Sequence, residues 1–335
     1  MTKYLFYFTK NYSIPIIQPL VKYLKTTDNE FRLFVTEKVY RSLPEDWKGK
    51  NVLTDLAAAK KYSPDFVLTP NNSVDFRIPG IKVQLFHGLG VEKSSHYVIR
   101  HFFDVYCTSG PFVTKQFLQL KQKHRYFDVI ETGWPKVDHI LNYDCTNLKT
   151  KMQIPENKKI ILFAPTHSKK MQSAESLLPT IPGIIKEDEL WLMKFHELMD
   201  VEIAGEFRDS ANFRIIDDFD ITPYLHIADV LITDTSSVAY EFLLLDKPLI
   251  TYRTQSRADK GIDISSPEKL RNALDECLMH AEKDLKIRKQ NLREVNPYLN
   301  GGISERIFTA LENHDFKIRK KPLNLFRKLK FLSKN

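Results

Sequence analysis

The 335-residue sequence has only three cysteines and no long apolar run. Cys107, Cys145 and Cys277 show neither CxxC nor metal-type spacing, so they are predicted to be reduced, structural thiols. No stretch approaches the roughly 18–20 apolar residues that a membrane-spanning helix needs. Residues 1–8 are too short for a signal-peptide core and predict a first strand instead. These absences indicate a folded protein that stays in the cytoplasm.

The excess of positive charge is confined to one segment. The chain has 50 Lys and Arg against 42 Asp and Glu, which gives a net charge of +8. Residues 317–334 hold eight of the basic side chains and no acidic one, and without them the two signs balance at 42 each. A nucleic-acid-binding body would spread its basic charge over a folded face. We therefore expect no nucleic-acid partner.

Short apolar stretches alternate with amphipathic helical patterns along both halves of the chain. This alternation predicts parallel sheets with helical crossovers, which is an α/β fold. The polar segment 144–157 is interpreted as the connection between two domains. Strands are predicted at 4–8, 31–35, 66–68, 83–86, 105–107, 129–132, 160–164, 190–195, 214–216, 230–233 and 249–252. Helices are predicted at 16–24, 111–120, 136–142, 223–228, 237–244, 267–283 and 304–313.

Two of these strands end in residue types that suit phosphate chemistry. The phrase 233–237, Thr-Asp-Thr-Ser-Ser, ends a strand and begins a helix, where backbone N–H groups can bind an anion. A plain helix cap is an equally good interpretation of that phrase. His87 follows another strand and precedes Gly88 and Gly90, and an imidazole there can take a proton from a hydroxyl. A histidine that is simply hydrogen-bonded in a loop is the alternative.

Lys194 and His196 stand at the end of a predicted strand of the second half and share one of its faces, because side chains alternate with a period of two. They could neutralise phosphate oxygens, although a solvated strand end explains them as well. Asp217, Asp218 and Asp220 lie in one predicted loop, which is typical of a solvated turn. We therefore expect no metal site and no cofactor.

Six phrases, in a fixed order along the chain, together resemble the CDP-glycerol glycerophosphotransferase family. That family includes teichoic-acid primases and polymerases and related capsule enzymes. This sequence departs from the family pattern at Gly90-Val91, where a proline is usual, and at His167-Ser168, where Trp-Arg is usual. The phrases are Phe86–Lys93, Gly133–Asp138, Ala164–Ser168, Lys194–His196, Ile232–Ser237 and Asn300–Arg306.

The resemblance implies two Rossmann-like domains in a glycosyltransferase-B (GT-B) arrangement, with a cleft between them. Residues 1–148 would form the acceptor-side domain and residues 149–315 the nucleotide-donor domain. The implied reaction transfers glycerol phosphate from CDP-glycerol, or a similar alditol phosphate from CDP-ribitol, to a hydroxyl of a membrane-linked glycan. CMP would be released, without a cofactor, in teichoic-acid or capsule synthesis. A priming or single-addition enzyme fits the short chain better than a polymerase.

Carried over residue by residue, the resemblance also assigns roles. His87 would be the base that activates the acceptor hydroxyl, His196 would steady the leaving CMP, and Asp234 would lie near the glycerol of the donor. Glu305 and Arg306 would reach the substrate, unless they are ordinary charges on a helix surface. The expected catalytic residues are His87, His196 and Asp234. The expected substrate-binding residues are Gly88, Lys93, Thr166, Lys194, Thr235, Ser236, Ser237, Glu305 and Arg306.

Residues 316–335 predict a basic amphipathic helix. Leu325, Phe326, Leu329 and Leu332 fall on one helical face, and the basic side chains lie elsewhere. Such a helix is typical of attachment to a membrane surface, and a disordered solubilising tail is the alternative. A peripheral enzyme on the inner face of the cell membrane, acting on a lipid-linked acceptor, would need such an anchor.

Two other functions remain open from the sequence. A nucleotide-sugar glycosyltransferase or a sugar-nucleotide epimerase would use the same fold, and fold does not fix function. An epimerase should carry several carboxylates for proton abstraction, and the sequence places none convincingly. A non-catalytic assembly or membrane-tethering protein is the second alternative, against which the joint presence of His87, His196 and Asp234 argues.

Overall fold

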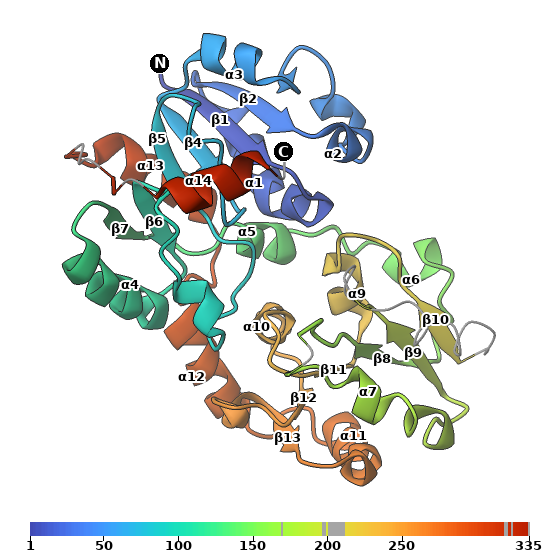
Figure 1. Ribbon diagram of the computed structural model, residues 1–335. Coiled ribbons are helices and arrows are strands. Elements are labelled where there is room, and N and C mark those ends of the chain that lie inside the picture. Colours follow the sequence, from blue (N-terminus) through green and yellow to red (C-terminus); the bar gives the residue numbers. More distant parts are fainter. Residues whose placement is uncertain (169, 196–198, 200–211, 318–320, 323, 334–335) are drawn as a thin grey trace. The chain divides into compact units, whose positions relative to one another are not determined.

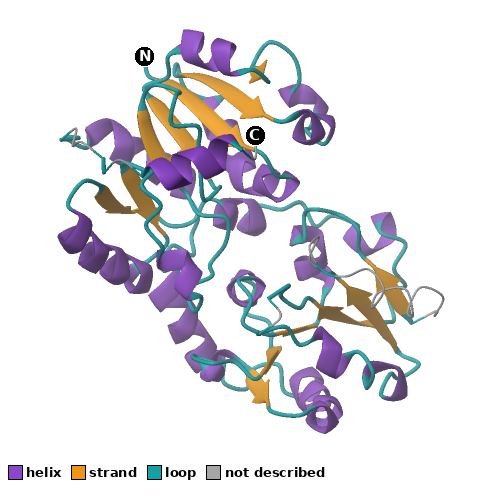
Figure 2. Ribbon diagram, viewed as in Figure 1, coloured by secondary structure: helices purple, strands orange, loops and turns teal. Residues whose placement is uncertain are grey.

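The structure is a computed structural model that describes residues 1–335 except 169, 196–198, 200–211, 318–320, 323 and 334–335. The chain divides into two compact units. The first comprises Met1–Gly88, Tyr97–His139 and Val295–Asn335, and the second comprises Leu89–His96 and Ile140–Glu294. Each unit is built around its own sheet, as the separate groups of strands in Figure 2 show.

The sheet of the first unit has seven parallel strands in the order β3-β2-β1-β4-β5-β6-β7 (Figure 1). The order reverses between β1 and β4. Residues on both faces of β1 are buried, which is expected for a strand covered on both sides. The strands are β1 Lys3–Phe8, β2 Glu30–Val35, β3 Val52–Leu53, β4 Phe66–Thr69, β5 Ile81–Gln84, β6 Val105–Thr108 and β7 Asp128–Glu131.

The second unit has six parallel strands in the order β10-β9-β8-β11-β12-β13. Here the order reverses between β8 and β11, which are hydrogen-bonded neighbours. Ligands of open α/β sheets bind beyond the carboxyl ends of the strands at such a reversal. The strands are β8 Lys159–Phe163, β9 Glu189–Met193, β10 Phe213–Ile215, β11 Val230–Thr233, β12 Leu249–Tyr252 and β13 Ile262–Ile264.

The helices of the described residues join and flank these strands. The apolar runs located the longer strands, whereas the short strands β3 and β13 and the helices α2, α3, α6, α7 and α12 were not predicted. Most of these elements are too short for a clear pattern, and polar side chains dominate α12. No helix in the described ranges is long and apolar enough to cross a membrane. The α-helices are α1 Ile14–Leu24, α2 Glu37–Arg41, α3 Leu56–Tyr62, α4 Pro111–His124, α5 Lys136–Leu141, α6 Leu148–Lys151, α7 Ala174–Leu177, α9 Thr222–Ile227, α10 Val238–Leu243, α11 Leu270–Met279, α12 Leu285–Val295, α13 Ile303–Asn313 and α14 Leu325–Leu332.

The two units differ from the domains expected from the sequence at residues 1–148 and 149–315. Helix α13 lies in the first unit, because Phe308 packs edge-on against Tyr4 of β1 at 4.9 Å between ring centroids. The Tyr4 hydroxyl also donates to Glu312 at 2.7 Å. Conversely, the short segment Leu89–His96 lies within the expected first domain but belongs to the second unit. The segment 144–157, interpreted as a linker, contains α6 and lies within the second unit.

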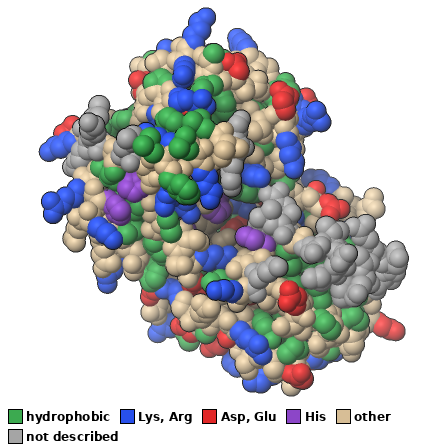
Figure 3. All heavy atoms as spheres, viewed as in Figure 1, with side chains coloured by type: hydrophobic (Ala, Val, Ile, Leu, Met, Phe, Trp, Pro, Cys, Tyr) green, Lys and Arg blue, Asp and Glu red, His purple; other side chains and the backbone are tan. Residues whose placement is uncertain are grey.

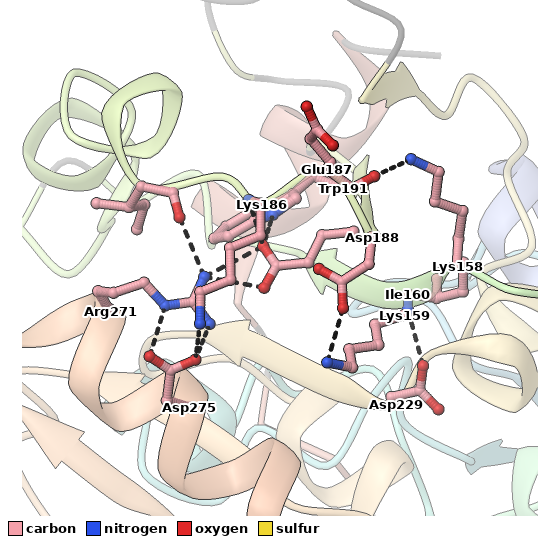
Figure 4. A network of polar contacts seen from close by, with 12 residues as sticks. Lys158, Lys159, Ile160, Lys186, Glu187, Asp188, Trp191, Asp229, Arg271 and Asp275 are labelled. Carbon is pink, nitrogen blue, oxygen red and sulfur yellow. Dashed lines mark hydrogen bonds and ion pairs between the residues drawn. The ribbon is translucent and has the colours of Figure 1, made fainter.

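Polar contacts fasten the amino ends of the strands in the second sheet (Figure 4). Glu189, the first residue of β9, is fully buried and accepts hydrogen bonds from Arg271 at 2.9 Å and from the indole N–H of Trp191 at 3.1 Å. Arg271 also pairs with Asp275 at 2.6 Å. This network ties α11 to the sheet at the end opposite to the strand carboxyl ends.

We expect Glu189→Gln to lower the free energy of unfolding by about 1–3 kcal/mol, because the buried Arg271 contact loses its charge and a Gln N–H faces other donors. Urea denaturation at pH 7 measures this loss. Lys159→Ala removes the solvent-exposed pair with Asp188 and serves as the control, with no measurable change expected. An equal loss in both variants would contradict the importance of burial.

Candidate active site

The exits of β8 and β11 meet at the point where the second sheet reverses its order. Beyond β8 the chain runs through Ala164, Pro165 and Thr166, and beyond β11 it runs through Asp234 and Thr235. The Ala164 N–H donates to the carbonyl of Ile232 at 3.0 Å, so the two exits stay paired past the end of the ladder. The predicted residues Thr166, Asp234 and Thr235 therefore lie together.

Asp234 joins these two exits through its carboxylate. The backbone N–H of Thr166 lies 3.0 and 3.1 Å from its two oxygens, and the N–H and hydroxyl of Ser173 donate at 2.9 and 3.0 Å. The side chain is fully buried, and burial raises the pKa of Asp234 to about 6, although the hydrogen bonds from Thr166 and Ser173 act in the opposite direction. No motif or periodicity pointed to Ser173, which lies in the loop after β8.

Lys93 reaches the same place from the segment Leu89–His96. Its amine lies 3.0 Å from the hydroxyl of Thr166. Burial lowers the pKa of Lys93, while the carboxylates of Asp234 and Glu92 oppose that change. Burial, and then the charge of Lys93, also lower the pKa of His167. The structure thus places a cation directly at the strand exits.

Lys194 lies one strand further along, just past β9. Its backbone N–H donates to the carbonyl of Phe163 at 2.9 Å, so the residue stands beside the exit of β8, and its side chain is half-buried. His196, which was predicted as a catalytic partner of Lys194, lies outside the described residues. Among the described residues, no group of three His, Cys, Asp or Glu side chains could hold a metal ion.

Ser236 and Ser237 precede α10 and are partly exposed. Ser237 occupies the N-cap position of α10, but its hydroxyl makes no capping hydrogen bond to that helix. The Ser236 N–H instead closes a tight turn with the carbonyl of Asp234 at 2.8 Å. With Lys93 and Lys194, these residues give the carboxyl edge of the second sheet hydroxyls and positive charge, which is a suitable arrangement for binding phosphate groups.

His87 and Gly88 lie in the first unit, beyond the end of β5. The strand ends at Gln84, two residues earlier than predicted, because Phe86 has a left-handed backbone with φ of 61°. The Phe86 carbonyl accepts a hydrogen bond from the indole of Trp134 at 3.1 Å. The His87 side chain is exposed, and its ring lies 5.9 Å from that of Tyr12. Strained backbone of this kind is common at functional sites.

Glu305 and Arg306 are exposed on α13, also in the first unit, and border a surface hollow of about 530 Å³. Arg306 lies over the ring of Tyr298 at 4.2 Å. Ser304, in the first turn of α13, donates both its hydroxyl and its N–H to Asp138 at 2.8 Å. Asp138 therefore connects two of the six phrases, an interaction that the sequence analysis missed.

Replacing Asp234 by Ala should lower the free energy of unfolding by about 2–5 kcal/mol, because two buried N–H groups lose their acceptor. Asp234→Asn keeps one acceptor oxygen and should cost less. Because the folded-state pKa is raised, the ionised carboxylate weakens the wild type as pH rises from about 4 to 6, and this part of the pH dependence should vanish in Asp234→Asn. Urea titrations across that range test both statements.

A sequence model of the family described as CDP-glycerol:poly(glycerophosphate) glycerophosphotransferase matches residues 92–313. The chain is 31% identical over 174 residues to a teichoic acid glycerol-phosphate primase of Bacillus spizizenii, a match that covers 49% of this chain and 45% of that protein. The match thus spans less than half the length of that relative.

Solved structures share the fold. A variant of the wall teichoic acid polymerase TagF, soaked with CDPG, superposes with a TM-score of 0.67 at 18% identity, covering 93% of this chain and 88% of that one. The S. aureus MnaA–UDP structure gives a TM-score of 0.67 at 18% identity, covering 97% of this chain and 100% of that one. Both likenesses fit the expected GT-B fold of two parallel-sheet α/β units. Because the family model spans more than half of the sequence, this chain belongs to the CDP-glycerol:poly(glycerophosphate) glycerophosphotransferase family.

Proposed function

We propose that this chain transfers glycerol phosphate, or a similar alditol phosphate, from CDP-glycerol or CDP-ribitol to a hydroxyl of a membrane-linked glycan. The observation that carries the proposal is the family match over residues 92–313, because that range contains Lys93, Thr166 and the strand exits around Asp234. These residues offer what a nucleotide diphosphate needs, namely cations and hydroxyls at the reversal point of an α/β sheet. One priming addition in teichoic-acid or capsule synthesis is the form of the reaction we favour.

In the proposed reaction, the acceptor oxygen attacks the phosphorus atom that carries glycerol. The bond between that phosphorus and the bridging oxygen breaks, and CMP leaves with the bridging oxygen. Negative charge therefore develops on the leaving phosphate, where fixed donors stabilise it most. Lys93 and Lys194 supply positive charge, and Thr235, Ser236 and Ser237 supply hydroxyls to the phosphate oxygens.

His87 takes the proton of the acceptor hydroxyl in this proposal. Its exposed ring can meet a substrate, and an imidazole is suited to proton transfer near neutral pH. His196 would assist Lys194 at the leaving group. Asp234 takes a positioning role, because its two oxygens already accept hydrogen bonds from Thr166 and Ser173. Glu305 and Arg306 stay candidates for contact with the substrate.

Helix α14 supports the proposed attachment to a membrane. Its apolar side chains Leu325, Phe326, Leu329 and Leu332 are 40–75% exposed, although the helix itself is packed on the first unit. Phe331 is buried against the rings of Phe76 and Phe102. The outward apolar face is bordered by basic side chains, and Figure 3 shows hydrophobic side chains gathered with Lys and Arg on the face of the molecule that carries α14.

Basic contacts hold α14 in this orientation. Arg327 donates to the carbonyl of Ile99 at 3.0 Å, and Lys321 pairs with Asp104 at 2.8 Å. An amphipathic helix normally buries its apolar face in its own protein. One that turns this face outward, with Lys and Arg around it, suits a surface of anionic lipid. We therefore propose a peripheral location on the inner face of the cell membrane, where a lipid-linked acceptor would be found.

His87→Ala should reduce the release of CMP from CDP-glycerol, measured with lipid-linked glycan acceptors, by about 10²–10⁴-fold. The reason is that the acceptor hydroxyl loses its base while donor binding remains. His280→Ala, at an exposed position of the second unit, is the matched control and should keep the wild-type rate. CDP-ribitol and UDP-GlcNAc complete the donor panel. Turnover of UDP-GlcNAc without turnover of either CDP-alditol would contradict the proposal and favour an epimerase or a glycosyltransferase.

The triple variant Leu325→Ser, Phe326→Ser and Leu329→Ser should bind vesicles that contain anionic lipid at least about tenfold more weakly than the wild type. Each exposed side chain contributes apolar area worth about 1.5–3 kcal/mol when fully buried. Co-sedimentation with vesicles measures the change. Met279→Ser removes a similarly exposed side chain from α11 and should bind like the wild type. Unchanged binding of the triple variant would exclude α14 as the anchor.

A further inference from the structure

The segment Leu89–His96 belongs to the second unit, although the residues on both sides of it belong to the first. Its last residues belong to the short 3-10 helix η3, Ser94–Tyr97, whose final residue Tyr97 is already part of the first unit. Lys93 is the residue of this segment that reaches the strand exits, where its amine contacts Thr166. The placement of that amine therefore depends on what fixes the segment to the second unit.

Glu92, the neighbour of Lys93, is fixed by a buried ion pair. Its carboxylate lies 3.0 Å from the amine of Lys260, and the exposed fractions of the two side chains are 4% and 0%. The same carboxylate oxygen accepts a hydrogen bond from the hydroxyl of Tyr240 at 2.7 Å. Tyr240 lies on α10, and Lys260 ends the short 3-10 helix η5, Ala258–Lys260.

Lys260 is itself held in place by contacts with residues further along the chain. The amine of Lys260 also donates to the carbonyl of Arg257 at 3.2 Å. Arg257 pairs with Glu294 of α12 at 2.8 Å and donates to the carbonyl of Asn291 at 3.1 Å. A fully buried ammonium is costly unless it is paired, so Lys260 strongly favours the one position of Glu92 that satisfies it.

We propose that Glu92, Lys260 and Tyr240 are positioning residues that hold the amine of Lys93 against Thr166, where the diphosphate of the donor would bind. The role given to Lys93 rests on the proposed function, whereas the placement of its amine does not. The family resemblance implies substrate binding for Lys93 and no role for Glu92, Lys260 or Tyr240, whose contacts appear only in the structure.

Glu92 also affects the charge of Lys93. Burial lowers the pKa of Lys93, and the carboxylates of Asp234 and Glu92 partly restore it. Among the described residues, His167 also interacts with Lys93, since burial, and then the charge of Lys93, lower the pKa of His167. Without the charge of Glu92, Lys93 should lose its proton at a lower pH. Its attraction to phosphate groups would then be lost at a lower pH, and the alkaline limb of the pH–activity profile would move to lower pH.

Four variants separate positioning from mere stability. Glu92→Gln removes the charge but leaves Lys260 buried without its carboxylate, so it should unfold more easily. The double variant Glu92→Gln/Lys260→Met removes both charges and should regain much of that stability. Tyr240→Phe removes only the hydroxyl that donates to Glu92. Glu189→Gln breaks a buried ion pair of the same unit at the opposite end of the sheet and is the matched control.

The measurements are kcat and KM for CDP-glycerol across pH, together with urea stability. In Glu92→Gln and in the double variant we expect KM to rise about tenfold, because the amine of Lys93 loses its fixed position. The alkaline limb should move to lower pH in Glu92→Gln and by less in the double variant, where loss of the Lys260 charge opposes loss of the Glu92 charge. Tyr240→Phe should change KM in the same direction by less. Glu189→Gln should lose stability and keep both the KM and the alkaline limb of the wild type. A double variant with wild-type KM and an unshifted limb would overturn the proposal.

A second readout is independent of activity. The amine of Lys93 is acylated by a small reagent at a series of pH values, and the modified peptide is quantified by mass spectrometry. The midpoint of this labelling should fall in Glu92→Gln, fall by less in the double variant, and stay unchanged in Glu189→Gln. An unchanged midpoint in Glu92→Gln contradicts the proposal. If the wild type turns over no CDP-alditol, the proposed function fails, and the labelling alone still decides whether Glu92 controls Lys93.

Discussion

The buried carboxylate of Asp234 is the contact on which the candidate site of the second unit depends. It stands where the described strands of that sheet reverse their order and accepts hydrogen bonds from Thr166 and Ser173. The loop after β8 and the turn after β11 are thereby fixed to each other. Because Thr166 in turn contacts Lys93, this carboxylate also fixes the residue that the Lys93 amine meets at the strand exits.

The first unit uses the same chemistry with another aspartate. Asp138, at the start of α5, accepts the N–H groups of Ile303 and Ser304 and so holds the first turn of α13. In both units a carboxylate bound by backbone N–H groups joins two stretches that are distant in the sequence. Such contacts preorganise a site, because the groups around it cannot relax toward water. Residues of the six family phrases thus hold distant stretches of the chain together, besides being candidates for contact with substrate.

Sequence reasoning succeeded where the signal was local. Apolar runs located the longer strands, and the family resemblance, now shown by the match over residues 92–313, came from short phrases. It failed where the answer depended on contacts across the chain. The place of α13 is decided by Tyr4 and Phe308, which are distant in the sequence. The role of Glu92 depends on Lys260, and nothing in the spacing of the two residues indicates that they meet.

The C-terminal helix α14 is a second case in which the sequence predicted the local structure but not its contacts. Its periodicity predicted an amphipathic helix, and α14 is one, but only the packing of Phe331 reveals that the apolar face points outward. From the sequence, the site residues could be predicted only as polar and charged side chains that follow the ends of strands. Which of them are already occupied by hydrogen bonds, as Asp234 is, could be learned only from the structure.

The most direct test of the central claim is to identify the nucleotide product by ³¹P NMR. The purified chain would be mixed with CDP-glycerol and lipid-linked glycan acceptors. Attack at the phosphorus next to glycerol predicts that CMP appears together with a new phosphodiester signal on the glycan. Formation of CDP, or consumption of UDP-GlcNAc while CDP-glycerol stays intact, would contradict the assigned chemistry.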